Sequence, residues 1–167
     1  LEYAPPASAS LAWENPRVID ELRLAASVIA GRDAPGGLEL LVIERSRTSR
    51  FLPGYVAFPG GAASEGDADL AAEWFGTTDE ASRACAIREL AEETALALTV
   101  DGLGPIGGWD PLSPVGMAPP STDQLPEMAH WIAPEDVPVR FDVRYYGVGS
   151  IDGLEPTPDG TEAAAAW

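Results

Sequence analysis

The hydrophobic pattern of the chain begins with two apolar, β-branched runs, at residues 24–30 (LAASVIA) and 38–44 (LELLVIE). Turn-forming residues at 31–37 separate them, so the pattern predicts an antiparallel hairpin. A short strand is expected at 55–58, immediately before a Pro-Gly-Gly turn. Further extended segments are predicted along the rest of the chain, at 96–100, 129–133 and 142–149.

Two helices are predicted between these strands. A short one is expected at 67–75, and a long one has Thr78 as its N-cap and ends near Thr94 and Ala95. The apolar face of the long helix consists of Ala81, Ala84, Ala86, Ile87, Leu90 and Ala91. Strands and helices mix without regular βαβ spacing. The pattern therefore predicts an α/β (α+β) fold, an α/β/α sandwich around a mixed β-sheet.

Composition and charge narrow the classes of protein to which this chain can belong. With 167 residues and 46% hydrophobic content, the chain is long enough for one domain with a core of its own. It contains no run of about 18 apolar residues, so no membrane span is expected. The net charge of −17 argues against binding to nucleic acid or to an anionic membrane surface.

Residue usage adds two expectations. All ten basic residues are arginines, so a bound anion must be held by Arg, by backbone N–H groups or through a metal. The single cysteine, Cys85, excludes an internal disulfide and lies at an apolar-flanked helical position. We expect a buried structural thiol there rather than a reactive one. The expected location is cytoplasmic, although one cysteine carries little weight on this point.

The segment RELAEET, residues 88–94, places three carboxylates on one face of the long helix. Glu89, Glu92 and Glu93 stand at i, i+3 and i+4, where like charges destabilise a helix by roughly 0.2–0.5 kcal/mol per pair. Taken alone, they favour a solvated face over a metal site. The alternative is a cage for a hard divalent cation such as Mg²⁺, which prefers oxygen ligands. Arg88 is expected to form a bidentate ion pair that fixes one carboxylate.

The residues before this segment extend the pattern. FPGG stands at 58–61, and Glu80 is followed by seven residues and then by Arg88. Together they resemble the Nudix box, G-x5-E-x7-R-E-U-x-E-E-x-G-U, in which U is a bulky apolar residue. Two departures occur: 18 residues instead of five separate Gly61 from Glu80, a 13-residue insertion, and Ala95 replaces a glycine. If the backbone leaves the helix with a positive φ, alanine there costs roughly 1 kcal/mol.

The resemblance implies a Nudix hydrolase that depends on Mg²⁺ or Mn²⁺. The direct metal ligands would be Glu92 and Glu93. Glu89 would be a third ligand or the base for the attacking water, and Arg88 would orient it.

The rest of the box would support the metal. Glu80 would act through a water molecule or hold the loop, and the backbone carbonyl of Gly60 or Gly61 would complete the coordination. We expect one Nudix domain over residues 1–167, with residues 1–20 peripheral to it. The C-terminal helix that usually follows in this family is expected to be missing from the chain.

Residues 41–61, which lead into the box, resemble the signature of coenzyme A diphosphatases. That signature is an apolar pair followed by R-S-x3-R-x3-G-x3-F-P-G-G, and Arg45, Ser46, Arg50 and Gly54 fall in register. Arginine forks suit phosphate oxygens, so Arg45 and Arg50 are candidate substrate clamps, with Ser46 beside them. The alternative is that this Arg-rich loop only keeps an acidic protein soluble.

Weaker candidates lie towards the C-terminus. Arg140 belongs to RFDVRYY, which resembles a strand of the insertion-bearing Nudix subset, and a structural ion pair with Asp142 is favoured over a substrate contact. Glu162 stands where Nudix proteins often keep another acidic residue near the site. His130, the only histidine, is expected to be packed rather than to act as a base.

The expected function is metal-dependent hydrolysis of a diphosphate bond in a nucleoside diphosphate linked to another moiety. Coenzyme A or an acyl derivative is the first substrate, with 3′,5′-ADP and 4′-phosphopantetheine as products. The alternatives are an ADP-ribose or dinucleotide pyrophosphatase, a non-catalytic nucleotide-binding module, and a scaffold with an acidic solvated helix. The expected partner is the nucleotide substrate, without nucleic acid or membrane, and a homodimer is left open.

Overall fold

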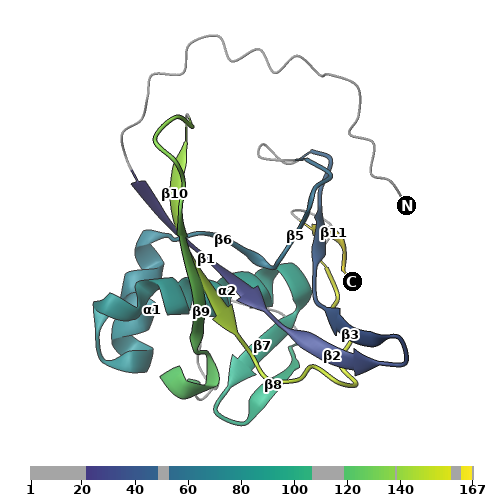
Figure 1. Cartoon of the computed structure of the whole chain (residues 1–167). Helices are drawn as coiled ribbons and strands as arrows, with labels where there is room; N and C mark the ends of the chain where they lie inside the picture. Colours follow the sequence, from purple (N-terminus) through teal and green to yellow (C-terminus); the bar gives the residue numbers. More distant parts are fainter. Residues whose placement is uncertain (1–21, 49–52, 107–118, 138, 159–162, 167) are drawn as a thin grey trace.

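A mixed four-stranded sheet forms the centre of the fold, with strand order β6-β1-β10-β9 (Figure 1). The structure is a computed structural model that describes residues 22–48, 53–106, 119–137, 139–158 and 163–166. β1 (Leu22–Ile29) runs parallel to β10 (Arg140–Gly147) and antiparallel to β6 (Gly60–Ala62). β9 (Glu127–Ile132) is antiparallel to β10. The predicted mixed sheet is therefore confirmed.

Shorter strands form three smaller sheets beside the central one. β4 (Ile43–Arg45) lies between β5 (Val56–Ala57) and β11 (Ala163–Ala166). The two hairpins are β2 (Gly31–Ala34) with β3 (Gly37–Leu40), and β7 (Leu96–Thr99) with β8 (Gly102–Pro105).

The predicted hairpin between residues 24–30 and 38–44 is wrong in its pairing. The hairpin is the smaller one formed by β2 and β3: β2 lies in the segment that was expected to be a turn, and β3 extends from its end into the predicted second strand. β1 instead pairs with β10, so that Leu22 lies opposite Arg140, more than 100 residues away. Such a long-range pairing leaves no trace in the local pattern. A single backbone hydrogen bond, from the Leu41 N–H to the Ala30 carbonyl at 2.8 Å, joins the ends of the two predicted strands.

Both predicted helices are present. α1 (Glu65–Phe75) begins after Ser64, whose backbone N–H donates to the Asp67 carboxylate at 2.7 Å. α2 (Ala81–Thr94) is preceded by the short 3₁₀ helix η1 (Thr78–Glu80). The side chain of Thr77, not of the predicted Thr78, caps this segment by accepting from the Asp79 N–H at 3.2 Å. No described helix is long and apolar enough to span a membrane.

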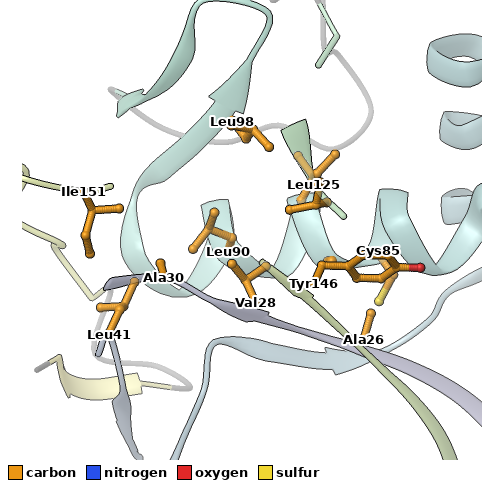
Figure 2. Close-up of a cluster of buried hydrophobic side chains, with 12 residues drawn as sticks. Ala26, Val28, Ala30, Leu41, Cys85, Leu90, Leu98, Leu125, Tyr146 and Ile151 are labelled. Atoms are coloured by element: carbon orange, nitrogen blue, oxygen red, sulfur yellow. The ribbon is translucent and has the colours of Figure 1, made fainter. Parts of the chain in front are cut away.

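The core lies between α2 and the central sheet (Figure 2). α2 packs on β1, and α1 packs on α2 (Figure 1). The central buried side chains are Ala26, Val28, Ala30, Leu41, Cys85, Leu90, Leu98, Leu125, Tyr146 and Ile151. The hydroxyl groups of Tyr146 and Ser82 share a hydrogen bond of 2.6 Å, which satisfies both in the interior.

Cys85 is fully buried in this core, as predicted. Burial, followed by the nearby charges of Asp67 and Glu89, raises the pKa of its thiol well above the ordinary value. The thiol is therefore a protonated, apolar packing group at neutral pH.

Ala95 ends α2 in the left-handed conformation, with φ 56° and ψ 26°. Among the described residues it is the one non-glycine residue with a positive φ. Its N–H donates to the Ala91 carbonyl at 2.9 Å, which completes the last turn. A slightly altered helix exit was expected for alanine at this position; the chain instead leaves the helix with the positive φ that glycine would take, and Ala95 bears the cost.

Replacing Ala95 with glycine is expected to stabilise the fold by about 1 kcal/mol, because glycine takes this backbone without the Cβ clash. Urea unfolding followed by circular dichroism measures the change. Ala72→Gly, at an exposed position of α1, is the matched control and is expected to destabilise by roughly 0.5–1 kcal/mol. A loss of stability in Ala95→Gly would contradict the strain argument.

Candidate active site

The three glutamates of RELAEET lie on the face of α2 that is turned towards β6. Glu89 is 7% exposed and Glu93 2% exposed, whereas the Glu92 side chain is 37% exposed. The solvated-face interpretation therefore fails for two of the three residues. Carboxylates this deep in a protein need compensating hydrogen bonds or positive charge.

The Gly60-Gly61 pair of β6 lies against these carboxylates. The Gly60 N–H donates to Glu93 Oε2 at 2.8 Å. A Cβ atom on Gly61 would come within 2.5 Å of Glu89 Oε1, and one on Gly60 within 2.3 Å of the Ala26 carbonyl oxygen. At Gly60 the close atoms include the β1 backbone, so a glycine is required there, whereas a side chain at Gly61 would have to displace the Glu89 carboxylate.

Arg88 contacts three carboxylates at once. Its Nη1 group donates to Glu89 Oε1 and to Glu92 Oε2, each at 2.8 Å. Its Nε and Nη2 groups donate to the two oxygens of Asp67, at 2.8 and 2.9 Å. A bidentate ion pair was predicted for Arg88; the partner in that pair is Asp67, a residue of α1.

The electrostatics of the cluster favour a charged arginine and leave an excess of negative charge. Burial lowers the pKa of Arg88, but the hydrogen bonds to Asp67 and the charges of Glu89 and Asp67 outweigh it and raise the pKa above the ordinary value. When all groups are ionised, the four carboxylates of the cluster (Asp67, Glu89, Glu92 and Glu93) exceed the single guanidinium by three charges.

The donor set of the cluster fits a hard divalent cation. Carboxylate oxygens of Glu89 and Glu93 lie beside the backbone of β6, and Glu92 shares the Nη1 group of Arg88 with Glu89. Mg²⁺ and Mn²⁺ prefer oxygen ligands. Within the described ranges, however, no three acidic, histidine or cysteine side chains are arranged to hold a metal ion. The Nη1 group of Arg88 bridges Glu89 and Glu92 instead.

Glu80 lies apart from this cluster. It precedes Glu89 by nine residues, about 13 Å along a helix axis. Its carboxylate accepts from Arg83 Nε at 2.8 Å. Asp67 is the acidic residue that contacts Arg88 instead, and the sequence analysis missed it. The signal was available, since Asp67 follows Gly61 at the G-x5 spacing of the box, with Asp in place of Glu.

The predicted substrate clamps lie in and after β4. Arg45 ends that strand, and its backbone N–H donates to the Tyr55 carbonyl at 2.9 Å. Ser46 is buried, and its hydroxyl group shares a hydrogen bond of 2.8 Å with that of Thr48. Arg50 lies outside the described residues, as does Glu162. The structure thus gives Ser46 a local role in the turn.

The predicted ion pair between Arg140 and Asp142 is not formed. Arg140 Nε donates to the Ala133 carbonyl at 3.1 Å, and Asp142 contacts His130 Nε2 at 2.5 Å. The β9–β10 register places His130 opposite Arg144, diagonal to Asp142 on the same face. His130 is therefore paired and partly exposed, not packed as predicted.

A cavity of about 760 Å³ lies at another place in the fold, where β1 and β10 end. Its lining includes Ile29, Leu38, Leu98, Met128 and Gly147. No residue of the carboxylate cluster lines it. The cavity is also lined by Arg32, Asp33 and Asp123, but the buried carboxylates that exceed their counter-ion lie at the cluster. We therefore place the candidate site at the cluster and not in this cavity.

Comparisons with known proteins identify the family of the chain. The NUDIX domain family matches residues 21–167. A crystal structure of a NUDIX hydrolase from Alicyclobacillus acidocaldarius is 31% identical, with a TM-score of 0.70 over 87% of this chain and 78% of that one. Among curated proteins, none matches the chain.

More distant structures share the fold. The NUDIX domain of Shewanella oneidensis NrtR, complexed with ADP ribose, is 14% identical, with a TM-score of 0.55 over 94% of this chain and 78% of that one. A Caenorhabditis elegans Ap4A hydrolase in a binary complex is 15% identical, with a TM-score of 0.53 over 87% and 78%. With the family match over almost the whole chain, these likenesses lead to one conclusion: the chain belongs to the NUDIX domain family and is a Nudix hydrolase.

Proposed function

We propose that this protein hydrolyses the diphosphate bond of a nucleoside diphosphate linked to another moiety, with a divalent cation bound at the α2 cluster. The observation that carries the proposal is the burial of Glu89 and Glu93 against the Gly60-Gly61 strand, with Arg88 beside them. Buried carboxylates that outnumber their positive partners destabilise a fold. Such a cluster is therefore better explained as a site that binds a cation.

The glutamates have different tasks in this proposal. Glu93 is held by the Gly60 N–H and forms the inner ligand, while the more exposed Glu92 is the ligand nearest solvent. Glu89 is a ligand or the base, with its orientation set by Arg88. The backbone carbonyl of Gly60 or Gly61 would complete the coordination; that of Gly61 also accepts from the Cys85 thiol at 3.7 Å. When bound, the cation neutralises phosphoryl charge and lowers the pKa of an attacking water.

Arg88 and the cation compete for the same oxygens. The Nη1 group donates to Glu89 and Glu92 and so reduces the repulsion between them. With a cation at the cluster, Glu89 and Glu92 would bind it in place of Arg88 Nη1, and Arg88 would keep its two bonds to Asp67. Glu80, which pairs with Arg83, holds the start of α2 rather than the metal.

Coenzyme A or acyl-coenzyme A is the proposed substrate, with 3′,5′-ADP and 4′-phosphopantetheine as products. Support comes from the register of Arg45, Ser46 and Arg50 with the coenzyme A diphosphatase signature, and from the absence of lysine in the chain. ADP-ribose is the second candidate, since it contains the same diphosphate and is bound by the Shewanella NUDIX domain. The complete set of glutamates argues against a non-catalytic module.

Incubation with Mg²⁺ and either coenzyme A or ADP-ribose, followed by product analysis, tests this function. We expect 3′,5′-ADP from coenzyme A, and a rate at least about 10–100-fold lower in Glu92→Gln, because this variant loses a metal ligand. The same variant should also lose stabilisation by Mn²⁺, which is about 2.7 kcal/mol at 100 times Kd.

The other outcomes separate the alternatives. Cleavage of ADP-ribose alone would retain the site and reject the proposed role of Arg45, Ser46 and Arg50. Stabilisation by Mn²⁺ without cleavage of either compound would favour a binding module. Neither cleavage nor stabilisation would leave only an acidic scaffold.

Gly61→Ala is expected to impair the site with little effect on stability. The added Cβ meets the end of the Glu89 side chain, which can swing aside, so the fold should lose less than about 1 kcal/mol. The displaced carboxylate should lower activity and Mn²⁺ affinity by roughly 10–100-fold. Activity assays, urea melts and a Mn²⁺ titration measure these quantities.

Gly104→Ala in β8 is the control for this substitution, because a Cβ there meets no atom within 4 Å. It should leave activity and Mn²⁺ affinity unchanged. Wild-type Mn²⁺ affinity in Gly61→Ala would show that the close approach of Gly61 to Glu89 has no part in metal binding.

A further inference from the structure

One carboxylate of the cluster comes from outside the RELAEET segment. Asp67, in the first turn of α1, is 1% exposed. It accepts hydrogen bonds from Arg88 Nε at 2.8 Å, from Arg88 Nη2 at 2.9 Å and from the Ser64 N–H at 2.7 Å. A carboxylate removed from water to this extent is stable only with such partners, so Asp67 and Arg88 depend on each other.

The planar shape of the guanidinium makes this pair directional. Asp67 occupies the edge formed by Nε and Nη2, and the Nη1 group at the other end donates to Glu89 and Glu92. Because the five N–H groups of arginine have a fixed fork geometry, holding one edge sets where the remaining N–H groups point. Asp67 therefore controls the contact of Arg88 with the two glutamates.

We propose that Asp67 is a positioning residue for the catalytic centre: it fixes Arg88 and, through Arg88, sets Glu89 and Glu92 for the divalent cation. The proposal rests on the proposed function, since it concerns the same metal site. It assigns α1 a role in metal binding, although α1 carries none of the proposed metal ligands.

The position of Asp67 in the chain supports this role. Five residues separate it from Gly61, the spacing that the box gives to its acidic residue. The extra residues then lie between Asp67 and Arg88, which are separated by 20 residues (68–87) where the box has seven. The insertion thus follows the acidic residue that contacts Arg88 and does not precede it.

The Ser64 contact couples the helix to the site. The same carboxylate that binds Arg88 accepts the Ser64 N–H, and so caps the first turn of α1. The first turn of α1 and the orientation of Arg88 thus depend on one side chain. A merely structural role would link the two helices in the same way, but it would leave the Mn²⁺ affinity of the folded protein unchanged.

The test is Asp67→Asn in the full chain, with Mn²⁺ alone as the probe. Isothermal titration should give an affinity 10–100-fold below that of wild type at temperatures where melts show the variant folded. Where substrate is cleaved, kcat should fall with little change in KM. Asp67→Glu keeps the charge but moves the carboxylate by one methylene group, and should give an intermediate Mn²⁺ affinity.

Two other variants complete the experiment. Asp69→Asn makes the same substitution at an exposed position of α1, and it should bind Mn²⁺ like wild type. Glu80→Gln tests whether Glu80 is the supporting acidic residue instead. Wild-type Mn²⁺ affinity in folded Asp67→Asn would overturn the proposal, and so would a loss of affinity confined to Glu80→Gln. If Asp67→Asn does not fold, wild-type affinity in Asp67→Glu overturns it.

A failure of the positioning role of Asp67 can be distinguished from a failure of the proposed hydrolysis reaction. Wild type that binds Mn²⁺ but cleaves no diphosphate, with weakened binding in Asp67→Asn, would retain the positioning role and reject the reaction. Wild type that cleaves substrate, with full Mn²⁺ affinity in Asp67→Asn, would retain the reaction and reject the positioning role.

Discussion

Arg88 lies where α1, α2 and β6 meet, and its guanidinium donates to Asp67, Glu89 and Glu92. A further donation, from Nη2 to the Ala62 carbonyl at 3.2 Å, joins it to the end of β6. Without the guanidinium of Arg88, these three carboxylates would lie close together in a largely buried place, with no positive charge to offset their repulsion. The packing of α1 on α2 and the geometry of the candidate site therefore depend on the same side chain.

The glycine pair of β6 supplies the second constraint. Gly60 and Gly61 pair with Ser27 and Ala26 of β1, and their other side faces the carboxylates of α2. A side chain at either position would separate the helix from the sheet edge or displace Glu89. The missing side chains thus allow α2 to pack closely on the sheet, and they bring a backbone N–H into contact with Glu93.

The acidic composition of the chain limits how the carboxylates of this cluster can be neutralised. A net charge of −17 and a total of ten arginines leave few cations to neutralise buried carboxylates. One of them, Arg88, is placed among Asp67 and the glutamates, and the negative excess that remains is what a divalent cation can balance. The i, i+3, i+4 repulsion that first made RELAEET unusual is thus offset partly by Arg88 within the protein, and in the proposed function partly by the bound metal.

The sequence alone determined several local elements and singled out Arg88 and the RELAEET carboxylates. The C-terminal end of α2, the cost of Ala95 at a positive φ, the burial of Cys85 and the family to which the chain belongs follow from short-range patterns and motif spacing. The β1–β10 pairing, the Asp67–Arg88 contact and the separation of Glu80 from the cluster were decided by tertiary structure. The strand pairing joins residues far apart in the chain. The contact of Arg88 with Asp67 instead of Glu80 depends on which acidic group the fold brings within hydrogen-bond distance. Spacing along the chain does not determine either of these distances in space.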